Sequence, residues 1–243
     1  MMALLKALWK FRPPDHPEAS GARLVRRWRE KRLLAKLEQD WPGGFTLHRT
    51  GDLIYVPHPL DARGRHALLH PPRAHPSALA FLGPGAVAID IGANLGEWTV
   101  PLARAVGASG QVLACEPAPR AAKALEATLG ANALRQAEVV RCAVGDHDGS
   151  AEFTMPVVTS AGTDTGTARI GAADRGHEAL SVPLSSLDSL AAERSLDRVD
   201  LIKIDVEGHE RQVLDGRGHS PPVSPDIGYR DRTRGHERPP SHP

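Results

Sequence analysis

The chain has 243 residues, a formal net charge of +1 and a hydrophobic content of 41%, which suits one sizeable α/β domain with a small appendage. The near-neutral charge and the aromatic content of 4% argue against nucleic acid as a partner. Because every apolar run is shorter than the roughly 18 residues of a membrane span and no signal peptide is evident, we expect a cytoplasmic protein without a transmembrane segment.

The first third of the chain is predicted to precede the main domain. Residues 1–44 form a predicted helical extension, because apolar residues recur at helical spacing between 20 and 40. Residues 45–85 are predicted to hold a β-hairpin around Thr50-Gly51-Asp52 and then an irregular connection over 57–76, which is rich in Pro, His and Arg.

From residue 86 to residue 216, the pattern alternates between strands and helices. Short apolar runs bounded by turns are typical of buried parallel strands. We predict strands at 86–91, 111–116, 137–142 and 199–206, and helices at about 97–106 and 119–130. This alternation predicts a doubly wound, mostly parallel α/β sheet.

Weaker signals lie between the third and fourth core strands. Residues 152–155 are predicted to form an edge strand, and residues 159–176, rich in Gly, Thr, Ala and Asp, a mobile surface loop. Residues 182–184 are interpreted as a short strand or turn. A serine at 185 or 186 is a candidate cap for a helix that ends at about Ala192.

A glycine turn follows the first core strand. Gly92 and Gly96 allow backbone angles that a Cβ would obstruct and let a ligand approach the main chain. Glu116 ends the next strand, twenty residues after Gly96, where a carboxylate can accept hydrogen bonds from both hydroxyls of a ribose. Together these features predict a nucleotide-like ligand at the carboxyl edge of the sheet.

Metal binding is not predicted. Cys115 and Cys142 lie in apolar runs and are interpreted as buried thiols. The histidines of the 57–76 segment match no standard metal-site spacing. Two carboxylates in one segment, Asp205 and Glu207, are too few to define a divalent-cation site.

Three motifs in order carry a resemblance to a known family. They are Asp90-Ile-Gly-Ala-Asn-Leu-Gly96, Glu116-Pro117 and Ile202-Lys-Ile-Asp-Val-Glu-Gly-His-Glu210. Together they resemble the FkbM-type S-adenosylmethionine-dependent methyltransferases, over about residues 45–216. The resemblance implies a class I methyltransferase (Rossmann-like) fold, S-adenosyl-L-methionine as cofactor and transfer of a methyl group, usually to a hydroxyl oxygen of a small molecule or glycan.

The resemblance also implies roles for individual residues. The turn after the first strand would hold the methionine part of the cofactor, an acidic residue in the strand would orient that turn, and the second strand end would hold the ribose. Backbone after the third strand would border the adenine. The cofactor-binding residues implied are Asp90, Gly92, Ala93, Asn94, Gly96, Glu116, Ala143 and Val144.

Methylation of oxygen calls for a base that takes the hydroxyl proton. The candidates are Asp205, Glu207, His209 and Lys203. Asp205 sits where a strand-end side chain would point at the methyl group, and it shares a strand face with Lys203. His209 has the ordinary pKa best suited to a base. The alternative is that the segment after the strand only shapes a turn, with its glutamates at the start of the following helix.

Apolar periodicity stops at residue 216, and Pro, Arg and His dominate thereafter. We interpret 86–216 as a methyltransferase domain that lacks its C-terminal strands and 217–243 as a disordered or frameshifted tail. Marginal stability and weak or absent activity are therefore expected. Sequencing the gene across this point tests the frameshift.

Two other functions compete with this one. A non-catalytic methyltransferase remnant would bind cofactor or a partner without turnover. An NAD-dependent oxidoreductase shares the glycine turn and distant acidic residue, but Asn94 stands where the dinucleotide motif has its second glycine. The methyl acceptor and the oligomeric state are not encoded in any pattern that we recognise.

Overall fold

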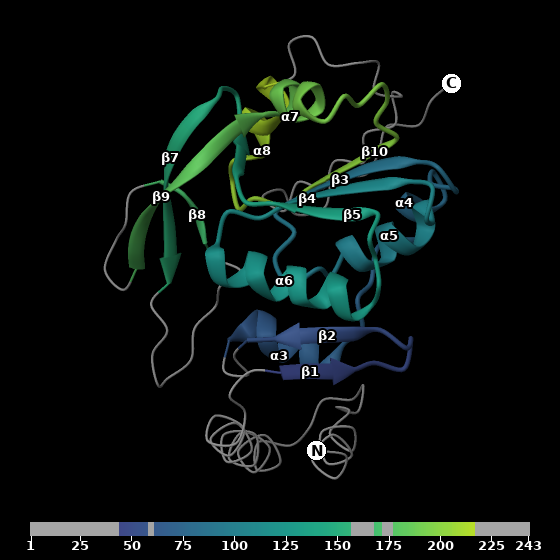
Figure 1. Ribbon diagram of the computed structural model, residues 1–243. Coiled ribbons are helices and arrows are strands. Elements are labelled where there is room, and N and C mark those ends of the chain that lie inside the picture. Colours follow the sequence, from purple (N-terminus) through teal and green to yellow (C-terminus); the bar gives the residue numbers. More distant parts are fainter. Residues whose placement is uncertain (1–43, 58–60, 157–167, 172–176, 217–243) are drawn as a thin grey trace, which may run out of the picture.

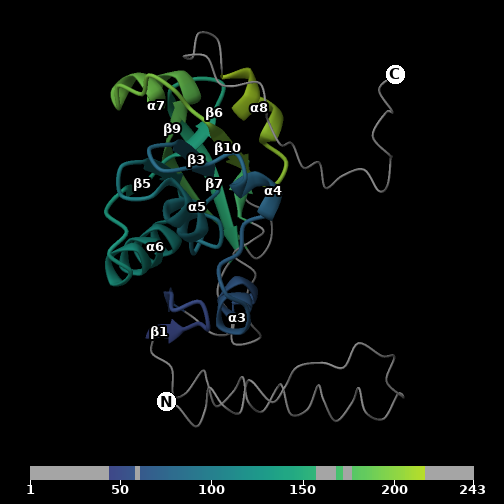
Figure 2. The ribbon, with the colours of Figure 1, turned by 90° about the vertical axis from the view of Figure 1, so that its right-hand side faces the viewer.

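The computed structural model describes residues 44–57, 61–156, 168–171 and 177–216. A four-stranded parallel sheet with helices on both faces forms the centre, and a second four-stranded sheet stands at one side (Figure 1). A two-stranded hairpin lies beyond the helices of one face (Figures 1 and 2). The predicted doubly wound, mostly parallel α/β sheet is therefore confirmed.

The central sheet has the strand order β10-β3-β4-β5. Its strands are β3 (Val87–Ile91), β4 (Gln111–Cys115), β5 (Ala137–Val140) and β10 (Leu201–Ile204). Helices α5 (Thr99–Val106) and α6 (Pro119–Ala131) cover one face, and α7 (Leu187–Glu193) and α8 (Glu210–Asp215) the other (Figure 1). The chain runs from β3 to β4 and β5 on one side of β3, whereas β10 lies on the other side of β3. The switch point, where α/β sheets bind ligands, therefore lies between β3 and β10.

The two faces of the sheet follow from alternation along each strand. Ala88 and Val112 pack with α5 and α6, whereas the neighbouring Ile89 and Leu113 pack with α7 and α8. All four side chains are at most 1% exposed. Strands covered on both faces are mostly apolar along their whole length, which explains why the sequence pattern located them.

The second sheet differs from the prediction. Its order is β6-β9-β7-β8, with β6 (Ala143–Gly145), β7 (Gly149–Pro156), β8 (Arg169–Ile170) and β9 (His177–Ser186). The segment expected to be an edge strand at 152–155 lies in the interior of this sheet. The segment expected to be a short strand or turn at 182–184 is part of a ten-residue strand. β7 pairs with β9 from Gly149↔Leu184 to Pro156↔His177, so long-range pairing extends both elements.

The hairpin of β1 (Gly44–Leu47) and β2 (Leu53–Val56) is present as predicted. The segment 57–76, expected to be irregular, contains helix α3 (Ala62–Leu69), and α4 (Pro76–Leu79) begins at its end. The Asp61 side chain accepts a hydrogen bond from the Arg63 backbone N–H at 2.8 Å, so it caps α3. Packing of Ala67 and Leu68 against the core then holds the helix in place.

Several predictions fall wholly or partly outside the described residues: the helical extension at 1–44, most of the loop at 159–176, and the tail at 217–243. The predicted serine cap is confirmed, because the Ser186 side chain accepts from the Ser189 N–H at the start of α7. None of the helices in the described ranges combines the length and apolar character needed to cross a bilayer.

Candidate functional site

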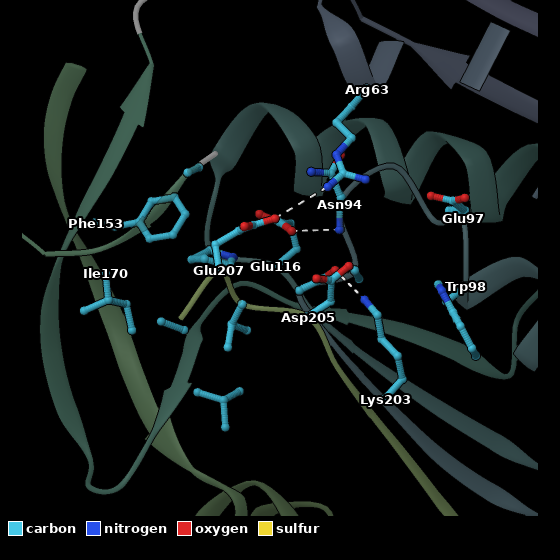
Figure 3. Close-up of a pocket in the computed structure, with 17 residues that line it drawn as sticks. Arg63, Asn94, Glu97, Trp98, Glu116, Phe153, Ile170, Lys203, Asp205 and Glu207 are labelled. Carbon is cyan, nitrogen blue, oxygen red and sulfur yellow. Dashed lines mark hydrogen bonds and ion pairs between the residues drawn. The ribbon is translucent and has the colours of Figure 1, made fainter. Parts of the chain in front are cut away.

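A cleft opens at the switch point, over the carboxyl ends of β3, β4 and β10 (Figure 3). It is open to solvent and encloses about 730 Å³, counted out to its open mouth. The turn after β3 forms its floor. Side chains from α3 and the second sheet form opposite ends (Figure 3).

The turn after β3 keeps the backbone close to the neighbouring strands. The N–H groups of Gly92 and Ala93 both donate to the Cys115 carbonyl, at 3.0 and 3.1 Å. Gly92 has φ +76°, and a Cβ built there would lie 2.1 Å from the Asp205 carbonyl oxygen. Asn94 also has a positive φ, of 49°. Only glycine fits at position 92, where the turn passes beside the chain that leaves β10.

Glu116 lies at the end of β4 and faces this turn. Its Oε2 accepts from the Asn94 N–H at 2.7 Å and its Oε1 from the Ala118 N–H at 2.8 Å. The residue is 5% exposed. Burial raises the pKa of the Glu116 carboxyl above its ordinary value, and the two backbone hydrogen bonds oppose that rise. Each oxygen keeps a further lone pair for a ligand.

A buried ion pair holds the turn from behind. Lys203 and Asp90 are register partners on β10 and β3, and the Lys203 Nζ lies 2.9 Å from the Asp90 Oδ1. The Lys203 Nζ also donates to the Gly92 carbonyl at 2.8 Å, and the Thr99 hydroxyl donates to Asp90 at 2.6 Å. Asp90 is fully buried. The pair therefore links β3, β10 and α5 directly beneath the cleft.

The chain leaving β10 forms a wall beside the glycine turn. The Asp205 N–H donates to the Ile91 carbonyl at 3.1 Å, and Asp205 and Glu207 both line the cleft. Glu207 has φ 51° and Gly208 has φ 97°, so the chain turns sharply here before α8. His209 follows this turn and does not line the cleft. A Cβ at Gly145 would lie 3.5 Å from the imidazole Nε2, and burial lowers the pKa of His209.

The structure brings most of the predicted site residues together. Those that line the cleft are Gly92, Ala93, Asn94, Glu116, Ala143, Val144, Lys203, Asp205 and Glu207. Asp90 lies beneath the floor, where it pairs with the cleft residue Lys203. Gly96 lies behind the turn, where a Cβ would be 2.6 Å from the Leu125 Cδ1.

Sequence reasoning missed several residues that line the cleft. Phe153 and Ile170, from β7 and β8, form an apolar end, and Arg63, Glu97 and Trp98 lie at the other end (Figure 3). Glu97 and Trp98 directly follow the glycine motif in the sequence, so their place at the cleft could have been predicted from that motif. Within the described ranges, no group of three or more His, Cys, Asp or Glu side chains is placed to hold a metal ion.

These features define the class of protein. A doubly wound parallel sheet, a glycine turn after its first core strand, an acidic residue after the second, and a cleft at the switch point form a class I methyltransferase (Rossmann-like) fold. The sequence matches the family described as the methyltransferase FkbM domain over residues 90–224. This is more than half of the chain, which belongs to that family.

Individual relatives are more distant. Methyltransferase 1 of Beauveria bassiana (strain ARSEF 2860) is 28% identical over 142 residues, which are 53% of this chain and 57% of the relative. This chain thus spans a little over half the length of that relative. The crystal structure of methyltransferase FkbM from Methylobacillus flagellatus KT has a TM-score of 0.35 and 17% identity, covering 81% of this chain and 45% of that one. A SAM-dependent O-methyltransferase from Thermotoga maritima has a TM-score of 0.27 and 26% identity, covering 41% and 40%.

Proposed function

We propose that the cleft binds S-adenosyl-L-methionine and that the chain transfers a methyl group to a hydroxyl oxygen of a small molecule or glycan. The observation that carries the proposal is the buried Glu116 carboxylate, 2.7 Å from the Asn94 N–H of the glycine turn. In a family of methyltransferases, such a carboxylate at the end of the second strand suits a ribose. The apolar end at Phe153 and Ile170 suits an adenine ring.

The charges of the cleft support this ligand. Among the described residues, four carboxylates line it, those of Glu97, Glu116, Asp205 and Glu207, and two cations, of which Lys203 is paired with Asp90. Carboxylates stabilise the sulfonium and ammonium charges of this cofactor. When bound, the cofactor supplies an electrophilic methyl group, so the protein has mainly to align the acceptor and exclude water.

We assign the proton-accepting role to Asp205, because Asp205 lines the cleft beside the glycine turn. Glu207 is the second candidate on the same wall. The Lys203 Nζ is engaged by the buried Asp90 carboxylate and the Gly92 carbonyl beneath the cleft, so it is directed away from an acceptor hydroxyl. We therefore propose that Lys203 positions the turn. His209, which follows the turn outside the cleft, takes no part in this assignment.

We expect Asp205→Asn to lower methyl transfer by about 10²- to 10⁴-fold, because the variant removes a general base. The measurement is incorporation of label from S-adenosylmethionine into acceptors of a cell extract. Affinity for S-adenosylhomocysteine should stay within about threefold of wild type, since Asn has nearly the same shape. Unchanged incorporation would remove Asp205 from the mechanism. Cofactor binding by the wild type without any incorporation would identify a non-catalytic remnant.

The raised pKa of Glu116 predicts a pH dependence of cofactor binding. As pH falls through this raised pKa, the carboxylate gains a proton and loses acceptor capacity for ribose hydroxyls. The affinity for S-adenosylhomocysteine, measured by calorimetry, should therefore begin to fall at a higher pH than it would if Glu116 had the ordinary pKa of a glutamate. We expect Glu116→Gln to bind about tenfold or more weakly at neutral pH and to lose this pH dependence.

Two results would contradict the assignment of Glu116. One is a Glu116→Gln variant that binds S-adenosylhomocysteine as wild type does. The other is heat of binding with NADH and none with S-adenosylhomocysteine, which would favour the oxidoreductase alternative.

A further inference from the structure

Arg63 reaches the cleft from outside the core of the fold. It lies in the first turn of α3, where its backbone N–H donates to the capping Asp61 carboxylate at 2.8 Å. From there the side chain extends over Asn94 at the mouth of the cleft (Figure 3). Arg63 precedes the region that matches the family, which begins at residue 90. Its contribution is therefore not part of that match.

The guanidinium of Arg63 is loosely paired. Its Nη2 lies 3.7 Å from the Glu207 Oε1, and the two side chains are 30% and 39% exposed. This separation exceeds the 2.7–2.9 Å or so of a charge-assisted hydrogen bond, so Glu207 approaches the guanidinium without closing a hydrogen bond to it. Among the described residues, no shorter ion pair of Arg63 competes with a ligand for this group.

Lys203, the other cation of the cleft, is already engaged. Its ammonium group lies 2.9 Å from the buried Asp90 carboxylate and donates to the Gly92 carbonyl at 2.8 Å. Among the described residues, four carboxylates line this cleft and repel an anionic ligand group, whereas the guanidinium of Arg63 attracts one. Arg63 is therefore the position at which a negative group of a ligand is stabilised.

We propose that Arg63 is a carboxylate-binding residue that takes the α-carboxylate at the amino-acid end of S-adenosylmethionine. The inference rests on the proposed function, in which Glu116 holds the ribose. Along the cleft, Phe153 and Ile170 lie at one end and Glu116 and Asn94 in the middle, and Arg63 lies above Asn94, on the side of Glu116 away from Phe153 (Figure 3). A nucleoside that starts at the apolar end and passes Glu116 thus directs its amino-acid end to Arg63. The planar guanidinium matches a carboxylate with two parallel hydrogen bonds.

The test compares two ligands that differ only at that end. S-adenosylhomocysteine carries the amino-acid carboxylate, whereas 5′-methylthioadenosine has the same nucleoside thioether without it. We expect Arg63→Met to weaken the binding of S-adenosylhomocysteine by about 10- to 100-fold. Its affinity for methylthioadenosine should stay within about twofold of wild type. The affinity of Arg63→Lys for S-adenosylhomocysteine should lie between those of Arg63→Met and wild type, since lysine keeps the charge but not the planar pair of donors. Arg65→Met, on the same helix but not lining the cleft, is the matched control and should bind both ligands as wild type does.

The outcomes separate this inference from the proposed function. Equal affinity of wild type and Arg63→Met for S-adenosylhomocysteine overturns the role of Arg63 and leaves the cofactor assignment standing. An equal loss of both ligands in Arg63→Met and Arg63→Lys shows a structural role and also overturns it. Absence of binding of either ligand to the wild type overturns the proposed function and this inference together.

Discussion

Replacing Lys203 with methionine is expected to lower the free energy of unfolding by about 3–5 kcal/mol, because it leaves a buried carboxylate without its cation. Asp90 is fully buried, and the Lys203 side chain is only 10% exposed. Methionine fills a similar volume but supplies no charge, so only the Thr99 hydroxyl remains as a donor to Asp90. Chemical denaturation followed by circular dichroism measures the loss.

Two controls make this result specific. The double variant Asp90→Asn with Lys203→Met removes both charges and should recover a large part of the lost stability. Arg141→Gln breaks an exposed pair with Glu126 and should leave the denaturation midpoint nearly unchanged, because water screens that pair. A Lys203→Met variant as stable as wild type would show that the ion pair does not hold the turn.

Replacing Gly92 with alanine is expected to destabilise the fold by about 2–5 kcal/mol through left-handed backbone strain and overpacking. The new Cβ would lie 2.1 Å from the Asp205 carbonyl oxygen, so the chain leaving β10 has to move away from the glycine turn. That movement separates the chain after β10 from the floor of the cleft. Binding of S-adenosylhomocysteine should therefore be lost even at temperatures where the variant remains folded.

Gly130 provides the matched control for this substitution. It lies in α6, and a Cβ there meets nothing within 4 Å. Gly130→Ala should therefore raise stability by about 0.4–1 kcal/mol and leave binding unchanged. Thermal denaturation of the two variants measures their stability, and calorimetry measures their binding of S-adenosylhomocysteine. A Gly92→Ala variant that folds and binds normally would disprove the close approach of β3 and β10 described above.

The core strands could be predicted because their signal is local. Buried parallel strands such as Val87–Ile91 are apolar at nearly every position, and that pattern is visible in the sequence. Helix α3 was missed because few apolar residues mark it, and contacts of Ala67 and Leu68 with the core stabilise it instead. The length of β9 was missed because Val182 and Leu184 are its buried residues, while pairing with β7 extends the strand on either side.

The same distinction applies to the candidate site. Gly92 and Asn94 belong to a strand–turn–helix motif that is visible as a short stretch of sequence, and Glu116 ends the next predicted strand. Arg63 and Phe153 reach the cleft only because α3 and the second sheet pack beside it, and no local pattern encodes that packing. His209 was included on its ordinary pKa, but the positive-φ turn at 207–208 directs it away from the cleft.

The crystal structure of the chain with S-adenosylhomocysteine tests the central claim most directly. We predict density for the nucleoside across the carboxyl ends of β3 and β4, with the ribose hydroxyls within hydrogen-bond distance of Glu116. The amino-acid end should continue past Asn94. Density for the nucleoside at another place, or an empty cleft in ordered crystals at saturating ligand, would contradict the account.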